Sequence, residues 1–257
     1  MLKDYDMHAT LASSDTGRAK QWFADKLGWA PTKELEGYLK YEVGPTAFSV
    51  FETPSAGTAK NTVLFWIVAD AGAEVRRLRD RGVVFEEYDF GDFKTVEGVM
   101  TDPEGNHTAW FKDADGNILS ILDSPEAMAT NVVGAMIASS DLDRSKDWYR
   151  KVGGYEPLWE YPGVVVGYRS GVSTFNVYKT EFAGTAQNTV AAFGVPDIRA
   201  EMADLRGRGV VFEDYDFGDA KTVDGLLVDT DGTTNAWFKD PDGNVLGIQG
   251  PEGLSEG

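Results

Sequence analysis

Few side chains in this chain of 257 residues have an ordinary pKa near neutral pH, because it has two histidines and no cysteine. His8 lies in an opening segment where His8, Thr10 and Ala12 alternate with Ala9 and Leu11, which is the period of a strand. A histidine has an ordinary pKa near 6.5, so we predict His8 as a general base or as a hydrogen-bonding group for a ligand. The alternative is a structural histidine. The lack of cysteine excludes thiolate nucleophiles, disulfides and cysteine-based zinc sites.

Tryptophans offer a second kind of chemistry, which is stacking. Trp110 and Trp237 each precede a phenylalanine on a predicted strand, so one residue of each pair faces away from the other. A rigid indole is a surface on which flat or cationic molecules stack. We therefore predict that Trp110 and Trp237 bind a ligand, with packing in the core as the alternative.

The chain contains an internal sequence repeat. "WFKDADGNILSI" (Trp110–Ile121) returns as "WFKDPDGNVLGI" (Trp237–Ile248), 127 residues later, and "RGVVFEEYDFGD" returns as "RGVVFEDYDFGD" at the same distance. The motif "SSD" repeats 126 residues apart, so one residue is inserted between the copies near 163–168. The pattern predicts two homologous domains, 1–125 and 130–251, joined by the linker "DSPEAMATN" (123–131).

Each half follows the order strand, helix, strands and then the same order again. In the first half, strands are predicted at 8–13, 39–43, 47–52, 63–68, 83–88, around 110–111 and at 118–122. Asp15 and Asp70 are predicted to cap two helices, which Gly28 and Gly82 end, and Asp197 caps a matching helix in the second half. The fold class is therefore α+β, with four βαβββ-like units.

This order, with the repeated "SSD" before a "WF" or "WY" helix and the repeated "DADGN" or "DPDGN" hairpin, resembles the vicinal oxygen chelate superfamily. That group includes glyoxalase I, extradiol dioxygenases and bleomycin-resistance proteins. The resemblance implies that paired units curl their sheets into a cup that holds a ligand. It also implies that the face of His8 lines the cup.

Enzymes of this group usually hold a divalent metal in the cup. The resemblance puts the closing Glu ligand on Ser120 and Gly247 and the first-strand ligand on His8 and Gly134, and the middle His position falls near Val63 and Val190. Of these residues only His8 has a side chain that could bind the metal, whereas a divalent ion needs three or four protein donors. We therefore expect no metal and no cofactor, and small residues that leave room for a ligand.

Further candidates for ligand contact are aromatic and polar residues on the strands, where they would surround and orient a bound molecule. Asn176 and Gln249 are polar where the first half has Ser49 and Leu122, so the two halves are expected to differ. The complete set of ligand-binding candidates is Tyr41, Phe51, Trp110, Ser120, Met136, Tyr168, Asn176, Tyr178, Trp237 and Gln249.

The net charge and the lengths of the apolar runs exclude some classes of binding partner. The net charge of −18 repels phosphate backbones, which argues against nucleic acid and is compatible with a cationic ligand. No apolar run is long enough to cross a membrane, and the charged first residues do not resemble a secretory signal. We expect a cytoplasmic protein, either a monomer whose halves form an intramolecular pseudo-dimer or a weak homodimer.

Two functions fit these residues. The first is a metal-independent protein of the bleomycin-resistance type that sequesters an aromatic or cationic natural product or antibiotic. The second is a metal-independent lyase, isomerase or cyclase that acts on a secondary metabolite with His8 as the general base. Whether the chain is an enzyme stays open at this point, and a metal-dependent glyoxalase or dioxygenase is disfavoured by the ligand count.

Overall fold

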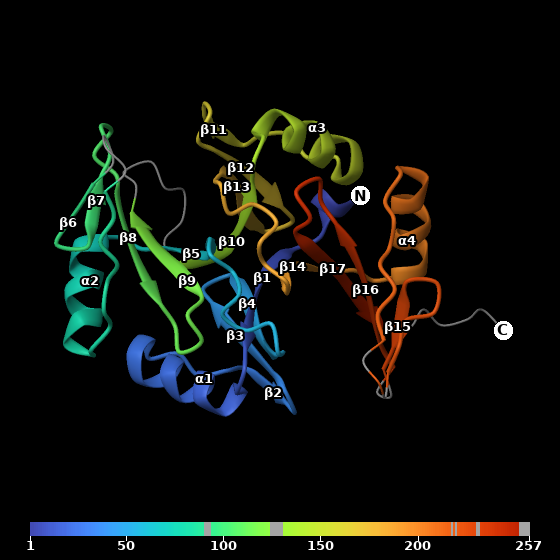
Figure 1. The fold of residues 1–257 in the computed structure, drawn as a ribbon, viewed down its shortest axis with the longest axis horizontal. Helices are drawn as coiled ribbons and strands as arrows, with labels where there is room; N and C mark the ends of the chain where they lie inside the picture. The colour runs from blue at the N-terminus through green and yellow to red at the C-terminus, as the bar shows by residue number, and fades with distance from the viewer. Residues whose placement is uncertain (90–93, 124–130, 217, 219, 230–231, 252–257) are drawn as a thin grey trace. The chain divides into compact units, whose positions relative to one another are not determined.

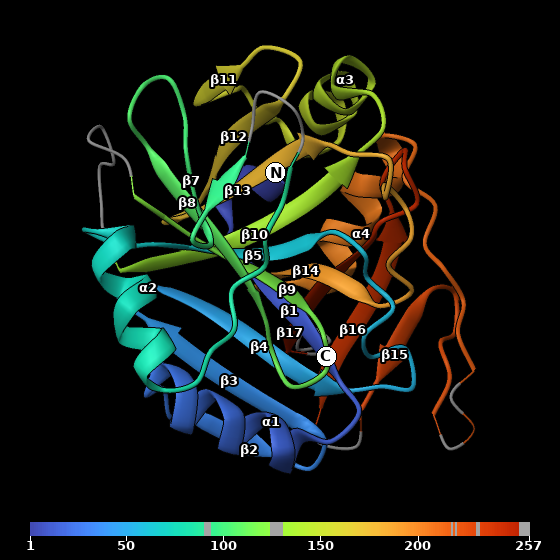
Figure 2. The same ribbon diagram turned by 60° about the vertical axis from the view of Figure 1, so that its left-hand side comes forward.

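A computed structural model describes residues 1–257 apart from 90–93, 124–130, 217, 219, 230–231 and 252–257 (Figures 1 and 2). The chain divides into two compact units. We call Ala9–Met136 the N-terminal unit, and Met1–His8 together with Ile137–Gly257 the C-terminal unit. Most of the predicted linker lies outside the described residues, so the domain limits 1–125 and 130–251 stay a prediction.

The N-terminal unit contains two successive sets of a strand, a helix and further strands. In each set the first strand pairs with the last in parallel, β1 with β4 and β5 with β9. The strand order across the sheet is β1-β4-β3-β2 in the first set and β5-β9-β8-β7-β6 in the second. The elements are β1 (Met7–Ser13), α1 (Thr16–Trp22) with the π-helical turn η2 (Phe23–Leu27), β2 (Lys33–Leu35), β3 (Tyr38–Val43), β4 (Thr46–Glu52), β5 (Thr62–Ile67), α2 (Ala71–Asp80), β6 (Thr95–Val96), β7 (Val99–Thr101), β8 (His107–Lys112) and β9 (Ile118–Asp123).

The C-terminal unit repeats this plan, with the strand orders β11-β12-β13 and β14-β17-β16-β15. Figure 1 shows α4 alongside β15, β16 and β17. The elements are η1 (Leu2–Asp4), β10 (Val132–Ser139, which begins in the N-terminal unit), α3 (Leu142–Gly153), β11 (Trp159–Tyr161), β12 (Val165–Ser170), β13 (Ser173–Lys179), β14 (Thr189–Gly194), α4 (Ile198–Gly207), β15 (Leu226–Val228), β16 (Thr233–Lys239) and β17 (Val245–Pro251).

The helices begin and end where the sequence predicts. Asp15, Asp70 and Asp197 each accept a hydrogen bond from the backbone N–H three residues later, which satisfies a free donor of the first turn. Gly28 follows η2 with φ +76°, a left-handed conformation that glycine adopts without strain. The predicted α+β class is confirmed.

One predicted strand is absent. Residues 83–88 make only the isolated bridge from Phe85 to Phe111, and Glu86 N–H donates to the Trp110 carbonyl. Val84 is 78% exposed, so this valine-rich run touches the sheet at one point instead of pairing along it. The short strands β6 and β7 form the sheet edge there.

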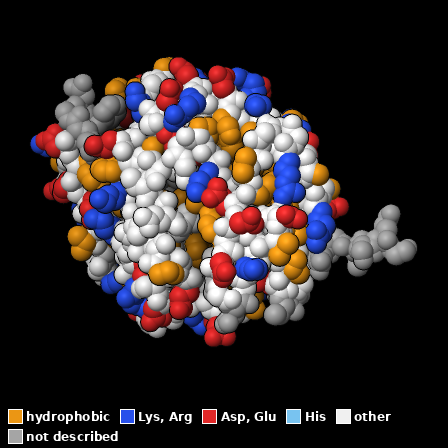
Figure 3. Space-filling view, turned by 45° about the vertical axis from the view of Figure 1, so that its right-hand side comes forward, with side chains coloured by type: hydrophobic (Ala, Val, Ile, Leu, Met, Phe, Trp, Pro, Cys, Tyr) orange, Lys and Arg blue, Asp and Glu red, His pale blue; other side chains and the backbone are white. Residues whose placement is uncertain are grey.

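Charges of both signs are mixed on the face of the molecule that Figure 3 shows. In the view of Figure 3, Asp and Glu side chains are interspersed with Lys and Arg side chains, with exposed apolar groups between them. None of the helices within the described ranges is long and apolar enough to cross a membrane.

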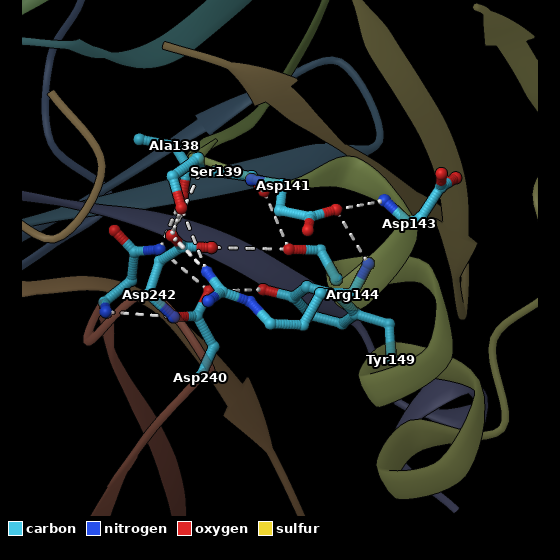
Figure 4. Close-up of polar contacts among 11 residues, drawn as sticks. Ala138, Ser139, Asp141, Asp143, Arg144, Tyr149, Asp240 and Asp242 are labelled. Carbon is cyan, nitrogen blue, oxygen red and sulfur yellow. Dashed lines mark hydrogen bonds and ion pairs between the residues drawn. The ribbon is translucent and has the colours of Figure 1, made fainter. Parts of the chain in front are cut away.

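A carboxylate network anchors the hairpin between β16 and β17 (Figure 4). Asp242 accepts hydrogen bonds from the backbone N–H of Ser140 at 3.0 Å and from Arg144 Nη2 at 2.7 Å. Asn244 Nδ2 donates to the Ala138 carbonyl at 2.7 Å and to Asp240 at 2.8 Å. The hairpin is thereby fastened to the end of β10 and the start of α3, so the network fixes where β17 begins.

The N-terminal unit repeats this network at the hairpin between β8 and β9. Asp115 accepts from Ser14 N–H at 2.9 Å, and Asn117 Nδ2 donates to the Ala12 carbonyl at 2.8 Å. Asp113 receives the backbone N–H groups of Asp115 and Asn117. The repeated "DADGN" and "DPDGN" motifs therefore encode one structural device.

The carboxylates of the network differ in pKa. Burial raises the pKa of Asp113 and of Asp240 to about 6, against the lowering effect of the hydrogen bonds that they accept. Burial alone would also raise the pKa of Asp242, but the hydrogen bonds from Ser140 and Arg144 and the guanidinium charge hold that pKa below its usual value. Asp242 therefore stabilises the fold as a carboxylate.

We predict that Asp242→Asn lowers the free energy of unfolding by about 1–3 kcal/mol at pH 7, because the Ser140 and Arg144 donors lose a charged acceptor whose side chain is buried. The lowered pKa in the folded state means that the contribution of Asp242 is present above about pH 4 and is lost as the pH falls. The difference between variant and wild type should therefore shrink below about pH 4 in urea unfolding. Asp147→Asn, whose side chain is 81% exposed, is the control and should stay within about 0.5 kcal/mol. A deficit as large at pH 3 as at pH 7 would contradict the assignment.

Candidate functional site

The clearest candidate surface lies on β14, β17 and β16 of the C-terminal unit. Gly247 on β17 pairs with Ala192 on β14 and with Trp237 on β16, so the three residues form one row across the sheet. A Cβ atom at Gly247 would lie 3.5 Å from Trp237 Cδ1 and 3.6 Å from Ala192 Cβ, which places all three on the same face. The buried Phe238 points to the other face, against Phe212. The row therefore offers an indole beside two very small residues.

Polar and aromatic groups border this row, and we call the surface of Trp237, Gly247, Ala192, Asn235 and Gln249 the Trp237 face. Asn235 pairs with Gln249 on the adjacent row, and Asn235 Nδ2 donates to Asp229 at 3.0 Å. Tyr215 meets the Trp237 ring edge to face, with centroids 5.6 Å apart, and so orients the indole. The face combines a stacking surface with two side-chain amides.

The N-terminal unit has the matching row on β5, β9 and β8. Ser120 pairs with Phe65 and with Trp110, and Tyr88 meets Trp110 edge to face at 5.5 Å. Phe65 is 1% exposed and Ser120 is 3% exposed. On the next row Thr108 pairs with Leu122. This face is filled by a phenyl ring where the Trp237 face has a methyl group, and it lacks the two amides.

The middle strands place Phe51, Asn176 and Tyr178 on sheet faces that point away from the helices. In the N-terminal unit Phe51 pairs with Tyr38, next to the buried pair of Thr10 and Ser49. Burial raises the pKa of Tyr38, and its hydrogen bond with Ser49 opposes that rise. In the C-terminal unit Asn176 pairs with Gly167 and Tyr178 with Val165.

Tyr41 and Tyr168 lie elsewhere than the sequence analysis expected. Tyr41 stacks on Phe48 at 4.8 Å and contacts Phe23 of η2, and it is 0% exposed. Tyr168, 1% exposed, packs in the same way on Phe175 and Tyr149. Strand alternation turns both tyrosines towards the helices, so they belong to the hydrophobic core, which removes them from any surface that a ligand reaches.

The remaining candidates lie on the first strands of the two halves. His8 is half-buried near the start of β1 and shares one side of that strand with Thr10. Met136 is half-buried on β10, two residues after Gly134, which pairs with Phe65. Their roles as base and as ligand contact stay predictions.

Among the positions where the resemblance puts metal ligands, only His8 carries a donor of the kind that those enzymes use. The Ser120 hydroxyl donates to the Leu64 carbonyl at 3.5 Å, and Gly247 has no side chain. Val63 and Val190 are each 1% exposed and apolar. Across the part of the chain that the structure describes, no group of three or more His, Asp or Glu side chains is arranged to bind a metal. The residues present do not fit a divalent ion.

Several residues of these surfaces were not predicted from the sequence. Strand register revealed Ala192 and Asn235, and a ring contact with Trp237 revealed Tyr215. Comparison of the two halves already shows that Ala192 replaces Phe65. Trp159 and Gly167 on β11 and β12 were missed as well. A glycine in the middle of a predicted strand, with a tryptophan on the preceding strand, would have indicated that Trp159 and Gly167 are neighbours.

We predict that Gly247→Ala folds as well as wild type, because the added methyl group meets its neighbours at ordinary contact distances of 3.5–3.6 Å. Its free energy of unfolding should stay level or rise by up to about 1 kcal/mol. Gly250→Ala on the same strand is the matched control, since its Cβ would lie 2.3 Å from the Val195 carbonyl oxygen. That variant should lose about 1–3 kcal/mol in thermal or urea unfolding. Equal stability of the two variants would refute the packing described for β17.

Comparison with known proteins agrees with this fold. The sequence pattern of the Glyoxalase/Bleomycin resistance protein/Dioxygenase superfamily matches residues 7–121 and again residues 131–248. The crystal structure of glyoxalase I from Zea mays superposes with a TM-score of 0.66 at 14% identity, covering 95% of this chain and 92% of that chain. A putative dioxygenase from Bacillus subtilis subsp. subtilis str. 168 superposes with a TM-score of 0.60 at 16% identity, covering 95% and 84%. No curated protein matches the chain in sequence. The resemblance is confirmed, and the chain belongs to the Glyoxalase/Bleomycin resistance protein/Dioxygenase superfamily, with two tandem domains.

Proposed function

We propose that this chain is a small-molecule binding protein of the bleomycin-resistance type that works without a bound metal. The observation that carries the proposal is the row of Ala192, Gly247 and Trp237, in which a stacking surface adjoins the position where the resemblance expects a metal-binding Glu. An indole beside very small residues provides contact area and space for a flat molecule. A sequestering protein needs these features and no reactive group.

The Trp237 face also supports a preference for the kind of ligand. Asn235 and Gln249 carry amides, each of which both donates and accepts hydrogen bonds. A flat aromatic molecule with an amide-like edge would stack on Trp237 and pair with these side chains. Antibiotics and other natural products that contain such rings are the proposed ligand class.

The two halves support unequal roles. The first half has Phe65, Ser120 and Leu122 where the second has Ala192, Gly247 and Gln249. Filling by Phe65 leaves less room beside Trp110 than Ala192 leaves beside Trp237. We therefore assign the ligand to the Trp237 face.

An enzymatic role rests on His8, which lies half-buried on β1 and has Gly134 as its counterpart. A lyase or isomerase of this kind would use the imidazole to move a proton. The binding role is the better supported of the two, because its residues lie together on one described sheet. A sequestering protein returns its ligand unchanged, which separates the two roles by experiment.

Naphthalene-2-carboxamide is a suitable first probe, since it combines a fused ring with an amide. We predict that it binds the wild type in a calorimetric titration and is recovered unchanged by mass spectrometry. Trp237→Ala should weaken binding by about 1–3 kcal/mol through the lost aromatic contact. Trp110→Ala is the matched control from the other half and should change affinity little.

Ala192→Phe is the most discriminating variant, because it gives the second half the phenyl ring that Phe65 provides in the first half. It should abolish binding, while Gly247→Ser, which likewise copies the first half with a smaller change, should weaken it. Retained binding in Ala192→Phe with an unchanged melting temperature would contradict the assigned face. Conversion of the probe by the wild type and loss of that conversion in His8→Gln would instead favour the enzyme.

A further inference from the structure

A second aromatic surface lies on β11, β12 and β13 of the C-terminal unit, separate from the strands of the Trp237 face. Trp159 is 46% exposed and is the one tryptophan of the seven that falls in the exposed class. Tyr161, two residues later on the same strand, is 40% exposed. Exposing two large aromatic side chains on one short strand has a solvation cost that nothing in the core requires.

Gly167 shows that the indole has a fixed place. Trp159 pairs with Gly167 across the sheet, and a Cβ atom at Gly167 would lie 2.2 Å from both Cε2 and Nε1 of the indole. Gly167 does not have a positive φ, so its backbone does not need glycine. Glycine inside a strand is unfavourable relative to alanine. Its presence at this position is explained by the indole that lies flat across it.

Two polar side chains on the same sheet face as this indole have no hydrogen-bond or ion-pair partner among the described residues. Asn176 pairs with Gly167 from β13 and is 7% exposed, and Arg169 lies two residues after Gly167 on the same side of β12. Neither side chain makes a hydrogen bond or ion pair with any residue in the described ranges. The strand rise of about 3.3 Å per residue puts Arg169 roughly 7 Å from Gly167, about the length of a fused ring.

The matching row in the first half has a different chemistry. Lys33 pairs with Lys40, which pairs with Ser49, so no aromatic ring occupies that row. The combination of Trp159, Gly167, Asn176 and Arg169 therefore arose in one half only. A general requirement of the fold would have kept it in both.

We propose that Trp159, Gly167, Asn176 and Arg169 form a second ligand site, which binds a flat aromatic carboxylate. The ring stacks on the Trp159 indole, the Arg169 guanidinium pairs with the carboxylate, and the Asn176 amide donates to a ring or carboxylate oxygen. The net charge of −18 repels anions, so binding of a carboxylate here depends on the local guanidinium. This site goes beyond the proposed function and stands independently of the Trp237 face.

The test is a ligand-observed NMR titration of the full chain with 2-naphthoate and, separately, with naphthalene-2-carboxamide. Trp159→Ala should weaken 2-naphthoate binding about tenfold or more, the scale of a lost stacking contact. Arg169→Gln should weaken 2-naphthoate binding about threefold to tenfold and leave the uncharged carboxamide unaffected. These two variants change exposed side chains, so folding is not at risk.

Gly167 gives a readout that a purely structural role would not produce. Gly167→Ala should displace the indole and reduce 2-naphthoate affinity as much as Trp159→Ala does. In the Trp159→Ala background the same change should have no further effect on affinity and should raise stability, because alanine then replaces a strand glycine without a clash. Gly207→Ala, whose Cβ would have no neighbour within 4 Å, is the control for the substitution itself.

The outcomes separate this site from the proposed function. No binding of 2-naphthoate to the wild type, or full affinity in Trp159→Ala, overturns the second site. Carboxamide binding that depends on Trp237 leaves the proposed function intact in that case. Binding of 2-naphthoate that depends on Trp159 and Arg169, with no carboxamide binding at the Trp237 face, supports the second site and refutes the first.

Discussion

The carboxylate network of the closing hairpins is the constraint on which the candidate surfaces depend. Asp242 and Asn244 join the hairpin to Ser140 and to the Ala138 carbonyl, and Gly247 follows three residues later. Trp237 lies on the strand that enters the same hairpin. Because these hydrogen bonds hold the hairpin against β10 and the start of α3, the network sets the position of the small residue beside the indole.

The sequence predicted much of this because local rules and repetition agree. Asp caps, a left-handed glycine and the doubled hairpin motif mark element ends wherever they occur. Strand alternation alone did not tell which side of a strand faces the helix, so Tyr41 and Tyr168 were placed at a ligand when they pack against Phe23 and Tyr149. The run 83–88 looked like a strand because valine favours sheets, yet Val84 is exposed and the run makes a single bridge.

Comparison of the halves shows what a duplicated chain can change without loss of its fold. The anchoring carboxylates Asp115 and Asp242 are kept in both halves, since each satisfies buried or helix-end donors. Positions on the sheet faces that point away from the helices differ between the halves: Phe65 corresponds to Ala192, and Lys40 corresponds to Gly167. No buried hydrogen bond ties these side chains, so their identity is free to follow a ligand. Register, more than any single motif, revealed them.

We infer that small-molecule binding by this protein does not use a metal. Calorimetric titration of chelator-treated protein with naphthalene-2-carboxamide, repeated after addition of Zn²⁺, Mn²⁺, Ni²⁺ or Fe²⁺, tests it most directly. Metal-independent binding predicts the same affinity in every titration and no stoichiometric metal in protein purified without chelator. Binding that appears only after a metal is added, or a tightly held metal that survives dialysis, would contradict it.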